Sequence, residues 1–343
     1  MKIARPDDWH VHFRDGDMLA DTVPPIARVF GRAVAMPNLR PPITTTAEAL
    51  AYADRLRAQS DRSGFLPLPS LYLTDRTDPA EIHRAAAAGL VAAKLYPAGA
   101  TTHSDAGVTD LDRLHPVLRA MDEVGLVLQI HGEVTDPDCD IFEREARFVS
   151  TTLAPLCNRY PDLRIILEHV TTAVGVAFIK SAGPNVAATI TAHHLEVDRS
   201  DLFRGGLRPH LYCLPVPKTR ADRDAVLAAA LCSEARFFLG SDSAPHPKAS
   251  KESACCPAGI YTGHAAILHY AEVFDRHGAI DRLEAFASHF GADFYGLVRN
   301  VDTITLERAP HVVAATHRLG TGEVVPYRAG ETLAWRIAST AAS

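Results

Sequence analysis

The sequence predicts a (β/α)8 barrel, and three observations support this fold class. Short apolar, β-branched segments recur eight times, and segments with helix signals separate them. Titratable side chains stand at the ends of several of these segments, which is where a parallel barrel carries its chemistry. No Gly-x-Gly-x-x-Gly motif follows the first segment, so a doubly wound sheet is the weaker alternative.

The expected strands are short and rich in Val, Ile, Leu and Ala, the composition of strands buried in a parallel sheet. They lie at residues 8–14, 33–36, 66–73, 91–96, 126–131, 164–169, 186–192 and 237–242.

Helix signals lie between these strands. Residues 45–48 (Thr-x-x-Glu) form the pattern of a capping box, and Asp78 followed by Pro79 is typical of a helix start. Asp110 precedes an apolar stripe at helical spacing that ends at Gly125. We expect residues 1–343 to form a single barrel domain, with residues 300–343 as a short, strand-like C-terminal extension that packs on it.

Composition narrows the function classes. A hydrophobic content of 47% and a charged content of 22% are those of an ordinary globular protein. The net charge of -6 and the lack of a Lys/Arg cluster argue against a nucleic-acid partner. No apolar run approaches the roughly 20 residues of a membrane span, and no signal peptide opens the chain. The six scattered cysteines predict reduced thiols, so we expect a cytoplasmic protein that acts on a small-molecule substrate.

Residues 9–14 (Trp-His-Val-His-Phe-Arg) carry the most informative pattern. Strand alternation predicts His10, His12 and Arg14 on one face. The same alternation predicts Trp9, Val11 and Phe13 as an apolar backing on the other face. Imidazole is the commonest protein ligand for metals, and guanidinium suits bidentate binding of carboxylate. This strand can therefore hold both a metal ion and the anionic end of a substrate.

Further titratable and polar residues stand at the carboxyl ends of the other expected strands. They are Asn38 after the second strand, Lys94 on the fourth, His131 on the fifth, His169 on the sixth and Asp242 on the eighth. A barrel brings these ends to one mouth. Each residue has a structural alternative, since a lone His can be a core residue and Asp242 can cap a helix. Together they form an inward cluster of cationic and titratable groups that needs a partner charge.

Divalent metal ions supply such a charge, because four imidazoles and a carboxylate are good ligands for Zn²⁺. One ion is ample for this set, and two crowd it unless a bridging anion is present. Burial beside cations lowers the pKa of a lysine, which can then react with CO₂ to give a carbamate. A carbamylated Lys94 could bridge two metals about 3.5–4 Å apart. A purely structural zinc site is a poor alternative, because such sites are usually closed by cysteines.

This pattern resembles the binuclear amidohydrolase superfamily, and within it the class II dihydroorotase family. The resemblance runs through nearly the whole chain. The segments that carry it are residues 8–15 (Asp-Trp-His-Val-His-Phe-Arg-Asp), 36–38 (Met-Pro-Asn), 94–102, 168–172, 240–246 and 251–259.

The resemblance implies reversible, zinc-dependent cyclisation of N-carbamoyl-L-aspartate to L-dihydroorotate in pyrimidine biosynthesis, by a homodimer with two Zn²⁺ per subunit. It implies that His10, His12, carboxylated Lys94 and Asp242 hold one zinc, and that Lys94, His131 and His169 hold the other. It assigns substrate binding to Arg14, Asn38, His131, Leu214, His246 and Ala258, and a closing loop to Thr101 and Thr102.

The chemistry follows from the metals. A bridging hydroxide attacks the ring amide carbonyl, and a metal polarises that carbonyl. Asp242 is placed to act as general base and then as general acid. The nearest alternative is another cyclic amidohydrolase, such as a hydantoinase or an allantoinase, but Arg14 and Asn38 favour an acidic substrate. A non-catalytic scaffold homologue is the other alternative, and such proteins usually lose ligands that are all present here. His193 and His194 end the seventh strand, near enough to the mouth to contact the metal ligands on the side away from the metal.

Overall fold

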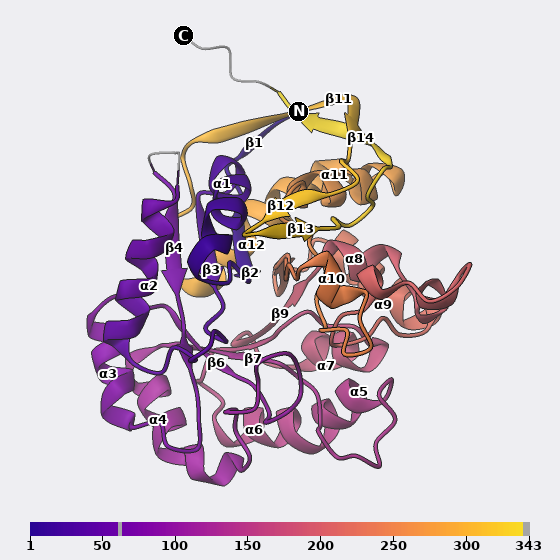
Figure 1. Ribbon diagram of the computed structural model, residues 1–343. Helices are drawn as coiled ribbons and strands as arrows, with labels where there is room; N and C mark the ends of the chain where they lie inside the picture. Colours follow the sequence, from indigo (N-terminus) through magenta and orange to yellow (C-terminus); the bar gives the residue numbers. More distant parts are fainter. Residues whose placement is uncertain (61–63, 339–343) are drawn as a thin grey trace.

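The computed structural model describes residues 1–60 and 64–338, and it confirms the barrel (Figure 1). Each expected strand position is occupied by a strand that runs parallel to its neighbours. The barrel strands are β2 (Asp7–Val11), β3 (Arg32–Ala35), β4 (Leu66–Pro69), β5 (Leu71–Tyr72), β6 (Ala92–Leu95), β7 (Val127–Ile130), β8 (Ile165–Leu167), β9 (Val186–Ile190) and β10 (Phe237–Leu239).

The third expected strand is divided in two. β4 pairs with β3, and β5 pairs with β6, so the continuous segment from Leu66 to Tyr72 joins two parallel sheets. Pro67 and Pro69 have no N–H to donate, which limits the ladder at this point. At the opposite seam the backbone N of Asp242 donates to the carbonyl of His10 at 2.8 Å, and this bond closes the barrel between β10 and β2.

The orientation predicted for Trp9 is wrong. The β2–β3 register shifts between Asp8 and Val11, where a bulge interrupts the alternation of side chains. Trp9 therefore joins the cluster inside the barrel, whereas Val11 and Phe13 pack in the outer core as expected.

The barrel interior is apolar at its floor and polar toward its mouth. The floor holds Trp9 together with one apolar side chain from each of the other strand positions, and these are Val34, Leu68, Ala92, Val127, Ile166, Ala187 and Phe238. α12 (Phe290–Tyr295) closes the floor, since Tyr295 stacks on Trp9 with ring centroids 4.4 Å apart. Above this layer the buried amide of Gln129 donates to the hydroxyl of Tyr295 at 2.9 Å. Polar side chains from several strands gather at the mouth.

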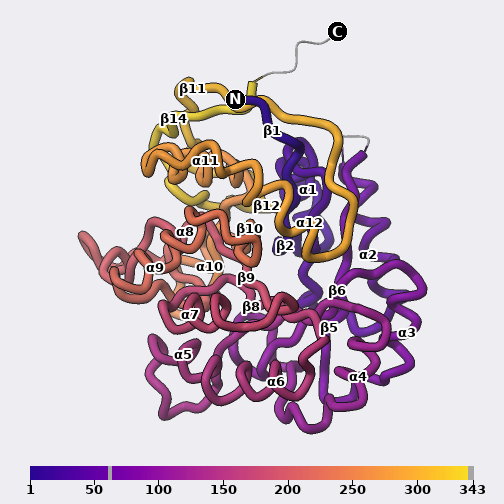
Figure 2. The backbone as a smooth tube through the Cα atoms, turned by 180° about the vertical axis from the view of Figure 1, so that it is seen from behind, coloured from indigo at the N-terminus to yellow at the C-terminus, as the bar shows by residue number. Residues whose placement is uncertain are grey.

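Helices surround the strands (Figures 1 and 2). They are α1 (Leu19–Val29), α2 (Thr46–Ala58), α3 (Pro79–Ala87), α4 (His115–Val124), α5 (Arg144–Phe148), α6 (Ala154–Arg159), α7 (Ala173–Ser181), α8 (Ala192–Glu196), α9 (Arg220–Leu231), α10 (Lys248–Lys251) and α11 (Ala266–Arg276). No helix within residues 1–60 and 64–338 has both the length and the apolar character that crossing a bilayer requires.

The predicted helix signals are confirmed. Thr45 and Glu48 form the capping box of α2, and the Asp78 side chain caps α3. Gly125 ends α4 in the left-handed conformation with φ of 68°, which glycine adopts without strain. The apolar stripe after Asp110 begins as a 3₁₀ turn, Leu111–Leu114, before α4 starts.

The C-terminal segment forms strands, as expected. β11 (Thr303–Val312) lies between β14 (Thr332–Ile337) and the N-terminal strand β1 (Lys2–Ala4), and both views show this sheet beside α11 (Figures 1 and 2). A hairpin of β12 (His317–Leu319) and β13 (Gly322–Val324) lies between β11 and β14 in the chain. Glu272 on α11 accepts from the backbone N of Ala334 at 2.9 Å, which fixes β14 to the helix.

Candidate active site

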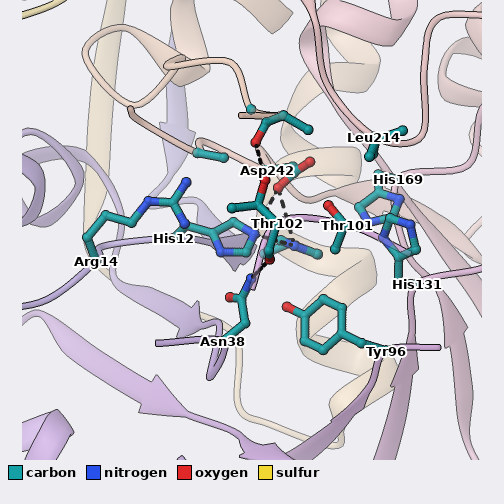
Figure 3. Close-up of a pocket in the computed structure, with 14 residues that line it drawn as sticks. His12, Arg14, Asn38, Tyr96, Thr101, Thr102, His131, His169, Leu214 and Asp242 are labelled. Atoms are coloured by element: carbon teal, nitrogen blue, oxygen red, sulfur yellow. Dashed lines mark hydrogen bonds and ion pairs between the residues drawn. The ribbon is translucent and has the colours of Figure 1, made fainter. Parts of the chain in front are cut away.

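A pocket opens at the carboxyl ends of the barrel strands (Figure 3). Most of the residues expected at the site line it. Its walls are His10, His12, Arg14, Asn38, Tyr96, Thr101, Thr102, His131, His169, Leu214, Asp242, Ala244, Ala258 and Gly259.

Three potential ligand atoms, at the ends of the first and last strands, lie within 3.4 Å of one another. Nε2 of His10 lies 3.4 Å from Nε2 of His12 and 3.4 Å from Oδ1 of Asp242. Nε2 of His12 lies 3.1 Å from the same carboxylate oxygen. Ligands about 2.0–2.1 Å from a tetrahedral zinc lie roughly 3.4 Å from one another. The spacing of these three atoms therefore fits one bound cation.

A buried carboxylate orients His10. Oε2 of Glu168 lies 2.7 Å from Nδ1 of His10 and accepts a second bond, of 2.6 Å, from the hydroxyl of Thr189. Burial opposes ionisation of Glu168, but the nearby His10 and Lys94 hold the pKa of this carboxyl below its ordinary value. An ionised Glu168 accepts a hydrogen bond from the N–H at Nδ1, which leaves Nε2 unprotonated and free for a metal.

A second set of nitrogen atoms lies beside the first. The rings of His131 and His169 are 4.9 Å apart, and the rings of His169 and His10 are 5.1 Å apart. Nε2 of His131 lies 2.7 Å from a carboxylate oxygen of Glu133, which leaves Nδ1 of this ring for another partner. Nδ1 of His169 is buried with no hydrogen-bond partner among the described residues. Burial and the neighbouring His131 keep the pKa of His169 well below its ordinary value, so the ring is a neutral donor.

Lys94 is fully buried, and its Nζ atom has no hydrogen-bond partner in the described ranges. Burial lowers the pKa of this amine to about 8, against the opposing effect of Glu168 and Asp242. A lysine is almost never buried in this way unless it is paired or modified. Its unpartnered amine, in the same site as the unpartnered Nδ1 of His169, fits a carboxylated lysine that ligates cations.

Asp242 is held in an ionised and strained state. Burial disfavours its charge, but His10 and His12 hold the pKa of the carboxyl below its ordinary value. Its φ is 42°, and His169 and Arg14 also have positive φ, of 43° and 64°. Non-glycine residues in this region gather at functional sites, where the surrounding structure compensates the strain.

Arg14 brings a buried cation to the pocket wall. Its Nε donates to the carbonyl of Pro245 at 2.9 Å, and its Nη2 lies 2.9 Å from Nε2 of His246. The same nitrogen of His246 lies 2.9 Å from the carbonyl of Ala258. A neutral ring nitrogen can accept from Arg14 or donate to Ala258 but cannot do both. His246 stands behind Arg14 and does not itself line the pocket.

A loop covers the pocket from the side of β6. The Asn38 side chain donates to the carbonyl of Thr102 at 3.0 Å, and the Thr102 hydroxyl donates to the carbonyl of Ala258 at 3.2 Å (Figure 3). These bonds join three segments across the opening, so the structure has the loop in a closed position. Leu214 lines the wall opposite Asn38.

Some residues of the site were missed from the sequence. Glu133 and Glu168 stand within two positions of an expected histidine ligand. A carboxylate close in sequence to such a histidine can orient its ring, so the sequence did contain a signal for both residues. Tyr96 lines the pocket two positions after Lys94. His193 and His194 are buried but do not line the pocket.

Comparison with known proteins agrees with this geometry. An amidohydrolase family model matches residues 7–314. Dihydroorotases of Vibrio vulnificus and Vibrio cholerae are both 56% identical to this chain over 338 residues, which cover 98% of this chain and 99% of each relative.

Solved structures agree as well. The dihydroorotase of Campylobacter jejuni has a TM-score of 0.90 at 35% identity, covering 98% of this chain and 97% of its own. The Saccharomyces cerevisiae dihydroorotase in complex with 5-fluoroorotic acid has a TM-score of 0.90 at 34% identity, covering 98% of both chains. The L-hydantoinase of Arthrobacter aurescens, at 17% identity and a TM-score of 0.81, shares the fold. The chain therefore belongs to the amidohydrolase family and, within it, to the dihydroorotases, which are cyclic amide hydrolases.

Proposed function

We propose that this enzyme interconverts N-carbamoyl-L-aspartate and L-dihydroorotate with two Zn²⁺ per subunit, in pyrimidine biosynthesis. One observation carries the proposal. A buried guanidinium, Arg14, lines the same pocket as a set of imidazole nitrogens and a carboxylate at ligand spacing. This pocket suits an anionic substrate held beside cations.

In this proposal His10, His12, Asp242 and Lys94 hold one zinc, while Lys94, His131 and His169 hold the other. Lys94, as N6-carboxylysine, would belong to both ligand sets. The bound cations supply an activated water at neutral pH and polarise the ring amide carbonyl. The unpartnered Nζ of Lys94 and Nδ1 of His169 support this assignment.

Asp242 moves the proton. Its carboxylate accepts a proton from the attacking water in the ring-opening direction and delivers it to the ring nitrogen as the C–N bond breaks. In ring closure the same carboxylate takes the proton from the ureido nitrogen as the C–N bond forms, and returns it to the carboxyl oxygen that leaves as water. The depressed pKa of Asp242 supports an ionised starting state.

Arg14, Asn38 and His246 bind the substrate α-carboxylate, with His246 acting through its contact with Arg14. The backbones of Leu214 and Ala258 contact the ring, and His131 borders it. A bidentate bond from Arg14 fixes the orientation of the reacting amide, from which much of the rate arises. Thr101 and Thr102 close over the bound substrate and exclude water.

The test combines metal analysis with assays in both directions. We expect about two zinc ions per chain, and turnover of dihydroorotate but not of hydantoin or allantoin. Treatment with a chelator should abolish turnover, and zinc with bicarbonate should restore it. An enzyme that stays fully active after complete removal of divalent ions would contradict the proposal.

We also propose that the enzyme is a cytoplasmic homodimer. The six cysteines are all free thiols, which supports a reducing compartment. The dimer rests on the family alone, and light scattering of the purified protein tests it.

A further inference from the structure

Tyr96 carries a hydroxyl at the pocket wall that has no hydrogen-bond partner among the described residues. The residue follows β6 directly, is 1% exposed and lines the pocket. Its hydroxyl oxygen is buried without a hydrogen-bond partner within the described part of the chain. In Figure 3 this hydroxyl points toward the side of the pocket on which Asn38 lies.

Buried tyrosines normally bond their hydroxyl, because leaving a buried donor unpaired is costly. The phenol rings nearby do bond theirs. The hydroxyl of Tyr52 donates to the carbonyl of Arg14 at 2.6 Å, and that of Tyr295 accepts from Gln129. Tyr96 therefore stands out as a donor that the fold itself does not use.

The ring of Tyr96 is held in place independently of its hydroxyl. It stacks on Tyr72 with centroids 5.2 Å apart and planes inclined by 26°. Nζ of Lys94 lies 5.2 Å from its centroid on the metal side of the pocket. The hydroxyl is therefore positioned before any ligand arrives, which reduces the entropy lost on binding.

A phenol O–H, whose ordinary pKa is about 10, is a hydrogen-bond donor at neutral pH. A neutral O–H beside a bound anion suits an oxygen acceptor, and it complements Arg14 without adding a second charge to the pocket.

We propose that Tyr96 is a substrate-binding residue whose hydroxyl donates a hydrogen bond to an oxygen of the bound cyclic amide or of its open acid. The inference rests on the proposed function and extends it to a residue outside the expected site. A ligand that lacks an oxygen at this point leaves the hydroxyl buried and unpaired, so the contact also contributes to specificity.

The test is Tyr96→Phe, which keeps the ring and its stacking and removes only the hydroxyl. We expect KM for dihydroorotate to rise roughly 3- to 10-fold, the effect of one neutral hydrogen bond, while kcat changes less. The Kd of orotate, measured by calorimetry, should rise by a similar factor. Zinc content and thermal stability should match those of the wild type. Tyr160→Phe is the control, because it removes a buried hydroxyl that lies 2.7 Å from Nδ1 of His115, and neither residue lines the pocket, so orotate binding should be unchanged.

The possible outcomes distinguish failure of the Tyr96 inference from failure of the proposed function. Wild-type enzyme that turns over dihydroorotate, with Tyr96→Phe unchanged in KM and orotate affinity, overturns this inference alone. Loss of zinc from Tyr96→Phe at unaltered orotate affinity also overturns it, because the hydroxyl would then serve the metal centre. Wild-type enzyme without activity on dihydroorotate contradicts the proposed function, and this inference falls with it.

Discussion

Oε2 of Glu168 lies 2.7 Å from Nδ1 of His10, although the two residues are 158 positions apart in the chain. The carboxylate is fully buried and takes a further bond from Thr189 on β9. The ring of His10 is thus fixed from behind, and its Nε2 atom faces His12 and Asp242. The pair of Glu168 and His10 therefore sets the direction in which Nε2 of His10 points into the pocket.

We predict that Glu168→Gln weakens metal binding by about 10- to 100-fold, the usual effect of removing a carboxylate behind a ligating histidine. The amide can still bond to Thr189 but no longer accepts a full charge-assisted bond from His10. Competition with a chromogenic chelator measures the affinity. Glu133→Gln, behind His131, is the matched variant and should affect the other ion. An unchanged affinity in both variants would show that these carboxylates only support the fold.

Asp242→Asn should abolish turnover, because the amide cannot accept the proton from water. Asparagine tolerates a positive φ better than most residues, so the backbone at φ of 42° should be preserved. Circular dichroism and zinc content report on fold and metal loading. Asp242→Ala removes the same proton acceptor and should also be inactive with its fold intact. Activity retained in either variant would refute the assigned role in proton transfer.

Arg14→Gln should raise KM for dihydroorotate by about 10- to 150-fold, because a charge-assisted hydrogen bond contributes roughly 1.5–3 kcal/mol. The KM of Arg14→Lys should lie between those of the wild type and Arg14→Gln, since lysine keeps the charge but loses the planar guanidinium. Initial rates over a range of substrate concentrations measure the effect. If kcat falls instead while KM holds, Arg14 acts in the transition state and not in substrate binding.

Much of this architecture could be predicted from the sequence, because its signals are local. Strand ends and helix caps depend on neighbouring residues, so the expected strands and the capping box at Thr45 were confirmed. Parallel topology then brings the strand ends to one mouth without any further information.

Other features depend on contacts between distant segments. Trp9 faces the barrel interior because a bulge interrupts β2, and alternation in the sequence gives no sign of that bulge. Glu168 and His169 are consecutive, yet both serve the site, since the positive φ of His169 breaks the alternation that would send them to opposite faces. The closed position of Thr102 likewise depends on bonds to Asn38 and Ala258 from remote loops.

The last prediction concerns a cluster of histidines outside the pocket. His269 on α11 is fully buried, and neither of its ring nitrogens has a hydrogen-bond partner in the described residues. Its ring lies 5.2 Å from that of His264 and 5.1 Å from that of Tyr327. Burial, followed by His264, Arg328, His193 and His311, lowers the pKa of His269 well below its ordinary value. The folded protein therefore holds this ring neutral.

Unfolding exposes His269 and returns its pKa to about 6.5. Above that pH neither state binds the proton, and the contribution of His269 to stability is fully present. As the pH falls below 6.5, the unfolded chain takes up a proton that the folded chain cannot, so stability falls by up to about 1.4 kcal/mol per pH unit for this group.

We therefore expect urea unfolding of the wild type to show stability decreasing from pH 7 to pH 5. His269→Leu should reduce this slope, because leucine does not titrate and leaves no polar atom unpaired. His277→Gln, at an exposed position at the end of α11, is the control and should keep the wild-type slope. Zinc is kept in excess throughout, so that any release of metal is common to all three proteins and cancels in the comparison. Equal slopes in wild type and His269→Leu would mean that the folded protein binds a proton at His269 as readily as the unfolded chain does, as it would if an acceptor paired with the imidazolium.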